Sequence, residues 1–276
     1  MFPNRLLFEN ITVDMLIQII GHLLAGCIGI SLGLLGGGGS VLTLPILVYV
    51  MEIPPKSAIA MTLVIVGVVS IVGAIPHWRK GNVNLKKAFL FGKATMLGAF
   101  FGANLAILPF ITEKIQLLLF AIMMIVAAVL IIQKNLLPPS FFSKENTNSN
   151  QKVQPVHRYS WLWLILEGLG IGILIGLVGV GGGFVIVPAL VLLGNTPIKE
   201  AIGTSLVIIA LNGIAGFLGY VGKVPLDWSL MASFTLVASF GTFFGAHLSQ
   251  YVQAKQLEKG FGYFLIVVAV FIFIQQ

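Results

Sequence analysis

The chain has 276 residues, of which 58% are hydrophobic and only 9% are charged, and its mean hydropathy is +1.03. Soluble domains carry about 25% charged residues, so this chain has too few ionic groups to cover a water-facing surface, and we identify it as an integral membrane protein. The net charge of +7 therefore does not indicate nucleic-acid binding, because Lys and Arg in a membrane protein mainly mark the cytoplasmic loops. Cys27 is the single cysteine, which excludes an intramolecular disulfide and a cysteine metal site.

The first apolar run begins soon after Arg5, as in a signal peptide, but no small-residue cleavage site precedes the glycines that end it. We therefore expect a retained first membrane helix. Further apolar segments follow in chain order, five in each half of the sequence. They cover residues 13–35, 41–51, 57–77, 86–108 and 112–132, and then residues 160–178, 184–194, 200–221, 228–249 and 258–274.

A membrane-spanning helix needs about 20 apolar residues, and four segments in each half are long enough. The second segment of each half has only eleven residues and contains a proline, Pro45 or Pro188, so it suits half a crossing. We favour an all-α helix bundle of eight transmembrane helices plus two half-helices that begin at glycine breaks. The alternative counts five membrane segments in each half, ten in all, arranged as an inverted repeat.

The two halves resemble one another at a constant offset of 143 residues. "GLLGGGGSVLTLP" (33–45) matches "GLVGVGGGFVIVP" (176–188), and "GAFFGANL" (98–105) matches "GTFFGAHL" (241–248). The alignment needs no gap over about seventy residues between these motifs. We interpret the pattern as an internal duplication of one membrane unit.

The duplication divides the chain into three parts. Residues 1–133 form the first membrane repeat, and residues 160–276 form the second. Residues 134–159, between them, are rich in Asn, Ser, Lys and Pro and cannot bury an apolar core. We expect this stretch to be a polar cytoplasmic linker.

Basic residues predict the orientation in the membrane. Arg79, Lys80, Lys86 and Lys87 lie close together after the third segment, and the linker carries four more Lys and Arg residues. Both stretches belong on the cytoplasmic side under the positive-inside rule. With four spans per half, the termini share that side and the halves are parallel copies. With five, the termini lie outside and the halves are inverted, so the charges fit both arrangements.

Several function classes are excluded by missing motifs. The glycines match neither the G-x-x-x-x-G-K-[ST] pattern of an ATP-binding loop nor the G-x-G-x-x-G spacing of a dinucleotide site. The four histidines form no metal-ligand pair, and nine acidic residues leave little for acid–base catalysis. We therefore expect no enzyme activity, no metal and no cofactor, and a function limited to binding and moving a solute.

The glycine breaks suggest how an anion would be bound. Irregular backbone survives at membrane depth only where it is buried in protein or lines a wet cavity. The first amides of a half-helix lack partners within their own helix and carry its positive dipole end, which favours an anion. Because Gly37 is replaced by Val180 in the second copy, we expect Gly37 to be dispensable. The alternative is close helix packing, which we expect for Gly98, Gly102, Gly241 and Gly245.

Polar residues inside apolar segments add further candidates. Lys93 lies about 12 Å along its segment at 1.5 Å per residue, where an ammonium group suits an anionic substrate, although its stem can also carry the charge back to the interface. Thr62, Thr204, Ser205 and Asn212 follow the breaks by one segment and either face a cavity or bond within the core. The candidate substrate-binding residues are Gly36, Gly38, Gly39, Ser40, Gly179, Gly181, Gly182, Gly183, Lys93, Thr62, Thr204, Ser205 and Asn212.

Three other polar residues have two readings each. Glu167 lies near the start of its segment, and either carries a coupling proton or reaches the interface. Asn104 and His247 occupy equivalent positions in the two halves, and we expect them to form hydrogen bonds between helices near the helix ends, with a role in ligand binding as the alternative.

The repeated glycine motifs, each followed by "P.K.AI" and a "GxFFGAxL" motif, resemble the TauE/SafE sulfite exporter family, also called the 4-toluene sulfonate uptake permeases. The resemblance covers nearly the whole chain apart from the linker and the extreme N-terminus. It implies a multi-pass transporter in the bacterial cytoplasmic membrane that moves small sulfur-containing anions such as sulfite or organosulfonates.

The expected partners are the small anionic substrate and the lipid bilayer, with no nucleic acid. A coupling proton and a homo-oligomer both stay open. An anion channel, or a permease for a carboxylate or another small anion, is the alternative function.

Overall fold

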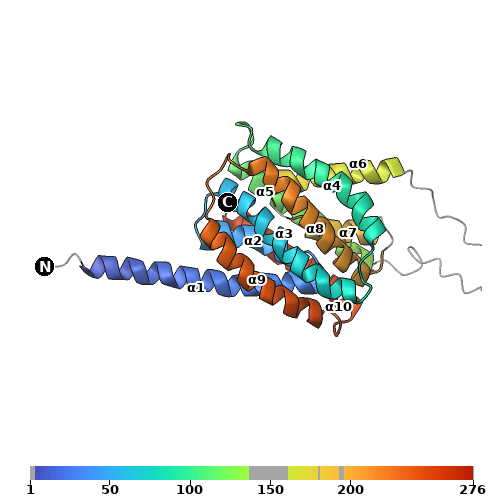
Figure 1. Ribbon diagram of the computed structural model, residues 1–276, viewed down its shortest axis with the longest axis horizontal. Helices are drawn as coiled ribbons and strands as arrows, with labels where there is room; N and C mark the ends of the chain where they lie inside the picture. The colour runs from blue at the N-terminus through green and yellow to red at the C-terminus, as the bar shows by residue number, and fades with distance from the viewer. Residues whose placement is uncertain (1–3, 137–160, 180, 193–195, 276) are drawn as a thin grey trace, which may run out of the picture.

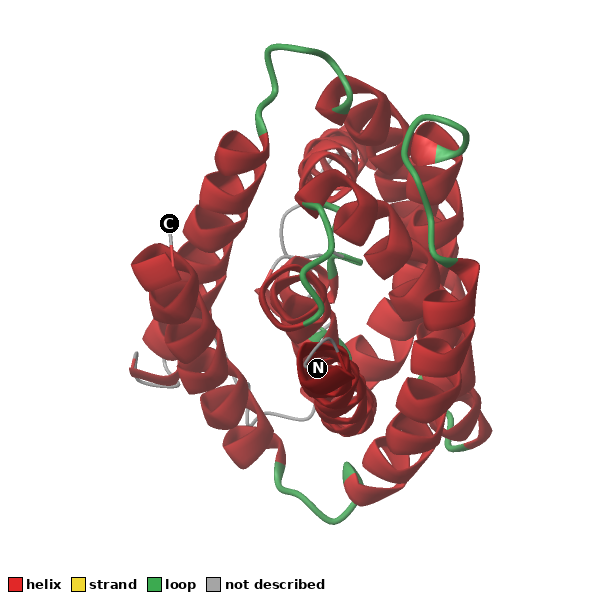
Figure 2. Cartoon of the chain, turned by 90° about the vertical axis from the view of Figure 1, so that its left-hand side faces the viewer, coloured by secondary structure: helices red, strands yellow, loops and turns green. Residues whose placement is uncertain are grey.

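The computed structural model describes residues 4–136, 161–179, 181–192 and 196–275, and these residues form a bundle of helices with no strand among them (Figures 1 and 2). The expected linker, residues 134–159, lies almost entirely outside the described residues. The predicted all-helical fold is confirmed for this part of the chain. The first half forms α1 (Asn4–Leu35), α2 (Gly38–Pro45), the π-helical turn η1 (Ile46–Val50), α3 (Pro55–Arg79), α4 (Leu85–Ala106) and α5 (Glu113–Leu136). The second half forms α6 (Trp161–Val178), α7 (Gly183–Leu192), α8 (Ile198–Tyr220), α9 (Trp228–Leu248) and α10 (Ala254–Gln275).

Five described helices are long and apolar enough to cross a membrane. They are Met15–Leu35, Pro55–Arg79, Leu85–Ala106, Ile198–Tyr220 and Trp228–Leu248. Two shorter apolar helices cover Gly39–Val50 and Leu166–Val178. Figure 1 shows α1 extending beyond the rest of the bundle at its N-terminal end.

The glycine breaks end α1 and α6 in the same way. Gly36 and Gly179 adopt left-handed φ angles of 68° and 72°, which glycine adopts without steric cost. Their amides donate to Leu32 O and Ile175 O, each at 2.8 Å, and so close the last turn of the preceding helix. The chain then reverses, because Gly39 lies against Ile28 and Leu32, and Gly21 lies against Met51. Helices α1 and α2 therefore form a hairpin.

The local geometry of the first half recurs 143 residues later. Helices α4 and α9 both begin at a side-chain cap, where Asn84 accepts from Lys87 N and Asp227 accepts from Leu230 N. His77 Nε2 donates to Gly33 O, and the equivalent Tyr220 hydroxyl donates to Gly176 O. The two halves thus share their caps and turns as well as their motifs.

Seams of small residues hold helices of one half against helices of the other. A Cβ added to Gly29 would lie 2.0 Å from Ala238 O, and one added to Gly33 would lie 2.2 Å from Thr242 O, so α1 and α9 run parallel in backbone contact. Helices α4 and α6 form the equivalent seam, in which Gly98 and Gly102 approach α6. The expectation of a close-packing role for Gly98, Gly102, Gly241 and Gly245 is confirmed.

The centre of the bundle is the contact between α3 and α8, which occupy equivalent places in the two halves. Leu63 lies against Gly213 and Gly216, whereas Gly67 lies against Ala210 and Gly213, so the two helices run antiparallel. Most residues of α3 and α8 are buried, and the two glycine breaks pack against this pair.

Candidate functional site

The two glycine breaks meet at the centre of the bundle. A Cβ on Gly37 would lie 2.2 Å from the carbonyl carbon of Gly183, and a Cβ on Gly183 would lie 2.4 Å from Gly37 Cα. The starts of α2 and α7 therefore touch backbone to backbone. We call this contact the glycine crossing. It is closed in this structure, because backbone and neighbouring side chains occupy the space beside each glycine.

The expectation that Gly37 is dispensable is wrong on steric grounds. Its place in the second half is taken by Val180, but Gly37 itself faces Gly183 with backbone atoms 2.2–2.7 Å from where a Cβ would stand. The backbone cannot rotate away as a flexible side chain would. The comparison of the two copies missed this restriction because the contact is not between equivalent positions. Gly37 of the first copy meets Gly183 of the second, and the first copy has Ser40 at the position of Gly183.

The other glycines of the breaks fit against aliphatic side chains of α1, α3, α6 and α8. Gly36 lies against Ile202, and the equivalent Gly179 lies against Ile59. Gly181 lies between Val66 and Ile209, and Gly182, with a φ of 75°, lies against Ile175. Gly38 begins α2. The breaks are thus embedded in a packed core rather than in an open loop.

Buried hydroxyl groups contact the carbonyls of the first glycine break. The single hydroxyl proton of Ser205 has two carbonyl acceptors in reach, Gly36 O at 2.9 Å and Ile202 O at 2.8 Å, and Ser40 donates to Gly37 O at 2.7 Å. Thr62, which is equivalent to Ser205, is fully buried, yet its hydroxyl has no hydrogen-bond partner.

Asn212, on α8, is also fully buried. Its Oδ1 accepts from the Thr95 hydroxyl at 2.9 Å, whereas its Nδ2 has no partner. Buried polar atoms without partners are costly, so each one calls for an explanation such as an absent ligand.

Two predicted site residues lie away from the crossing. Lys93 is on the exposed face of α4, with its ammonium 6.0 Å from the centre of the Phe89 ring. This exposure fits the expectation that the lysine stem carries its charge back to the membrane interface. Thr204 accepts from Asn84 N at 2.9 Å, near the start of α4. Asn104 accepts from Lys223 Nζ at 2.8 Å, and because Lys223 lies in the loop after α8, this is not the expected bond between helices. Glu167 has a buried Oε2 without a partner.

A cavity of about 660 Å³ opens where the α1–α2 hairpin, the start of α3 and the start of α9 meet. We call it the polar cavity. Its polar lining residues are Gln18, His22, Glu52, Ser57, Asp227, Ser229 and Ser233. Its apolar lining includes Met61 of α3 and Leu230 of α9.

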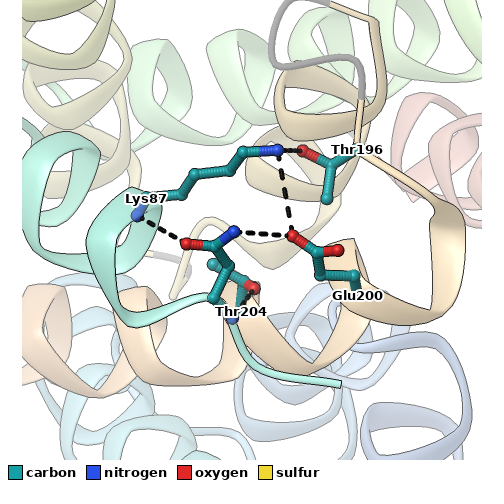
Figure 3. Close-up of polar contacts among 5 residues, drawn as sticks. Lys87, Thr196, Glu200 and Thr204 are labelled. Atoms are coloured by element: carbon teal, nitrogen blue, oxygen red, sulfur yellow. Dashed lines mark hydrogen bonds and ion pairs between the residues drawn. The ribbon is translucent and has the colours of Figure 1, made fainter. Parts of the chain in front are cut away.

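The opposite end of the bundle has a cluster of polar contacts between the starts of two helices (Figure 3). Lys87 Nζ donates to Thr196 Oγ1 at 2.8 Å and lies 3.8 Å from Glu200 Oε1. Asn84 Nδ2 donates to the same Glu200 oxygen at 2.9 Å, and its backbone amide donates to Thr204. We call these five residues the polar latch. It ties the start of α4 to the start of α8.

The polar cavity and the polar latch occupy equivalent places in the two halves. At the offset of 143, Lys87 corresponds to Leu230 and Glu200 corresponds to Ser57. Asn84 corresponds to Asp227, and both residues cap their helices. The same pair of helix starts is thus joined by side chains at one end and separated by a cavity at the other.

Sequence reasoning missed both features. The residues of the latch are ordinary polar residues near helix ends, and nothing in the local sequence brings positions 84, 196 and 200 together. The available signal was the alignment of the two halves itself, in which Lys87 and Glu200 are charged and their counterparts are not.

The comparisons with known proteins agree with the architecture. The sequence profile of the family "Sulfite exporter TauE/SafE" matches residues 22–272, nearly the whole chain, and the chain therefore belongs to this family. It is 32% identical over 264 residues to a probable membrane transporter protein of Xylella fastidiosa (strain 9a5c), covering 95% of this chain and 96% of the relative. It is 28% identical over 245 residues to the probable membrane transporter protein YdhB of Bacillus subtilis (strain 168), covering 89% and 94%. No solved structure matches the chain.

The chain is therefore a membrane transporter of the TauE/SafE family and not an enzyme. Among the residues that the structure describes, no group of three or more His, Cys, Asp or Glu is arranged to hold a metal ion.

Proposed function

We propose that this protein is a secondary transporter of small sulfur-containing anions, such as sulfite or an organosulfonate, in a bacterial cytoplasmic membrane. The family membership supports the transporter class and the substrate class together. The observation that carries the mechanism is the asymmetry between the two equivalent ends, with a cavity at one and the polar latch at the other. A transporter that exposes its site alternately to each side needs such a difference between its ends in any one state.

The mechanism requires that the two halves be inverted copies. Equivalent helices α3 and α8 run antiparallel, and α1 runs parallel to α9 while α6 runs parallel to α4. This pattern is expected of an inverted repeat whose pseudo-twofold axis lies in the membrane plane. It supports the arrangement with five membrane segments in each half, residues 1–133 and 160–276, over the arrangement with four.

The distribution of basic residues assigns the ends. The basic residues of the described chain at the polar-latch end include Arg79, Lys80, Lys86, Lys87, Lys134, Lys199, Lys255 and Lys259. Those at the polar-cavity end include Arg5, Lys56, Lys114 and Lys223. Under the positive-inside rule the latch faces the cytoplasm and the cavity faces outward. The structure then corresponds to an outward-facing state that is closed on its cytoplasmic side.

The substrate binds at the glycine crossing once the halves move apart. The first amides of α2 and α7 and the hydroxyls of Thr62 and Ser205 offer donors, and the half-helix starts favour negative charge. The partnerless Nδ2 of Asn212 adds a donor on α8. Lys93 has no part in this site, because it lies on the exposed face.

Thr62→Val separates substrate binding from packing. Removing a hydroxyl that has no partner leaves stability unchanged or slightly higher, whereas Ser205→Ala removes a hydroxyl that donates to the Gly36 or Ile202 carbonyl and should cost about 1 kcal/mol. A lost bond to a charged substrate is worth about 1.5–3 kcal/mol, so Thr62→Val should reduce uptake about tenfold or more. Thermal unfolding in detergent and uptake into vesicles measure the two effects. Unchanged uptake by Thr62→Val would remove Thr62 from the site.

Vesicle uptake tests the substrate class. The purified protein is reconstituted into vesicles of phosphatidylethanolamine and phosphatidylglycerol, and a pH gradient is applied. Radiolabelled sulfite should accumulate, unlabelled methanesulfonate or another organosulfonate should compete, and acetate at the same concentration should not. If no sulfur oxyanion accumulates or competes, the proposed substrate class is wrong. Competition by acetate alone would assign the protein to carboxylates.

A further inference from the structure

The polar cavity has a charge that does not suit an anion. Two carboxylates, Glu52 and Asp227, line it together with one imidazole, His22, and no Lys or Arg side chain is among its described lining residues. Lys56, in the first turn of α3, and Lys223, in the loop after α8, are outside the lining, and Lys223 donates a hydrogen bond to Asn104. An anion that enters from this side therefore meets two negative charges unless a cation accompanies it.

Glu52 lines the cavity in an unusual backbone conformation. Its φ of 55° lies in the left-handed region, which a glutamate adopts at a cost of about 1–2 kcal/mol. Glu52 follows η1 and precedes the Pro54 that caps α3. The backbone thus accepts strain at a residue that gives the cavity one of its carboxylates.

The hydrogen bonds of His22 define what its two ring nitrogens can do. Nδ1 lies 2.7 Å from Gln18 O, and a carbonyl oxygen only accepts, so Nδ1 carries a hydrogen. Nε2 lies 2.9 Å from the Ser233 hydroxyl oxygen, which in turn lies 3.1 Å from Leu230 O. The single proton of Ser233 has two acceptors in reach, Nε2 and Leu230 O.

This arrangement satisfies His22 in both of its charge states. When the imidazole is neutral, the Ser233 hydroxyl donates to Nε2. When a proton binds Nε2, the Nε2–H donates to Ser233 Oγ, and the Ser233 hydroxyl rotates to donate to Leu230 O. Only one hydroxyl rotates, and no polar group loses its partner. Imidazole is also the side chain that changes charge most readily between about pH 5 and pH 8.

We propose that His22, switched through Ser233, is the proton-binding site that couples transport to the proton gradient. The inference rests on the proposed function. A proton from the outer solution binds Nε2 within the polar cavity, where Glu52 and Asp227 attract it, and it lowers the net negative charge that an incoming or leaving anion meets. Protonation thus becomes linked to the movement of the anion through the same cavity.

Nitrogen NMR tests the proton site without any substrate. The full chain is labelled with ¹⁵N-histidine in lipid nanodiscs, and the signals lost in His22→Gln are assigned to His22. The proposal expects Nε2 of His22 to gain and lose a proton as the pH is varied over the range in which the protein stays folded, while Nδ1 keeps its hydrogen throughout. Ser233→Ala should shift the midpoint, and Ser233→Thr should restore it. A His22 signal that stays constant over this range would overturn the proposal.

Transport measurements then test the coupling. In vesicles, His22→Gln should lose accumulation driven by a pH gradient but retain exchange of labelled for unlabelled sulfite. His247→Gln is the matched control, because it removes an exposed histidine at the other end of the protein, and it should retain both activities. Gradient-driven accumulation by His22→Gln at the wild-type level would overturn the proposal, as would loss of exchange together with accumulation.

Two further outcomes distinguish a failure of the His22 assignment from a failure of the proposed function. Loss of gradient-driven accumulation in Glu167→Gln but not in His22→Gln would move the proton site to Glu167, the carboxyl with a partnerless oxygen, and overturn the assignment. If the wild-type protein moves no sulfur oxyanion, the proposed function fails, and the NMR titration still decides the proton site by itself.

Discussion

Gly37→Ala is expected to destabilise the protein and abolish transport. The added Cβ would stand 2.2 Å from the carbonyl carbon and 2.3 Å from the carbonyl oxygen of Gly183, and backbone on both sides of the glycine crossing leaves no flexible atom to yield. Overpacking of a close-packed core costs about 1–3 kcal/mol. Thermal unfolding in detergent should show the lower stability, and vesicle uptake should show the loss of transport.

Gly170→Ala is the matched control for this prediction. Gly170 lies within α6, is exposed, and has nothing within 4 Å of an added Cβ. The same chemical change should therefore leave stability and uptake unchanged or raise stability slightly, because alanine favours a helix over glycine by about 1 kcal/mol. A Gly37→Ala protein that unfolds and transports like the Gly170→Ala control would show that the breaks are not in close contact.

The second large effect is expected when the polar latch is given the residues found at the cavity. The double variant Lys87→Leu, Glu200→Ser gives these two positions the residues that stand at the equivalent positions of the cavity end, Leu230 and Ser57. It removes the Lys87–Thr196 hydrogen bond, the half-exposed Lys87–Glu200 ion pair and the Asn84–Glu200 hydrogen bond. Each contact is worth about 0.5–1.5 kcal/mol, so the equilibrium should shift toward the cytoplasm-open state about tenfold or more.

Thiol labelling reports this shift. A cysteine is placed at Ser57 after Cys27 is changed to Ser, and a membrane-impermeant maleimide is applied from outside. In the double variant the cysteine at position 57 should react more slowly than in the protein with an intact latch. Lys223→Met, which removes a lysine bonded to Asn104 at the other end, should not change this rate. Equal labelling rates in the double variant and this control would mean that the latch does not hold the state.

The sequence was sufficient to predict the all-helical membrane fold and the position of both breaks. The pattern of apolar segments and the motif repeated at 143 residues are local features, and the geometry at Gly36 and Gly179 follows from them. The number of crossings did not follow, because a segment of eleven apolar residues fits either half a crossing or the returning arm of a hairpin. The contacts of Gly39 with α1, and of Gly21 with Met51, were needed to identify the hairpin.

The site was predictable only in part. The glycines lie in motifs that could be recognised, and the structure brings Gly37 against Gly183 and Ser205 against Gly36. Whether these residues bind a substrate stays a prediction, as it does for Thr62 and Asn212. The latch and the polar cavity depend on contacts between residues more than one hundred positions apart, such as Asn84 with Glu200 and His22 with Ser233. Lys93 was a candidate on depth alone, but depth does not determine which face of a helix a side chain occupies.

Counterflow in vesicles tests most directly the claim that the protein is a transporter with alternating access. Vesicles containing the purified protein are loaded with unlabelled sulfite, all ion gradients are removed, and a trace of radiolabelled sulfite is added outside. A transporter should concentrate the label inside transiently, because each inward movement of label is exchanged for unlabelled sulfite moving out. A label that rises only to its equilibrium level, without an overshoot, would indicate a channel and contradict the account.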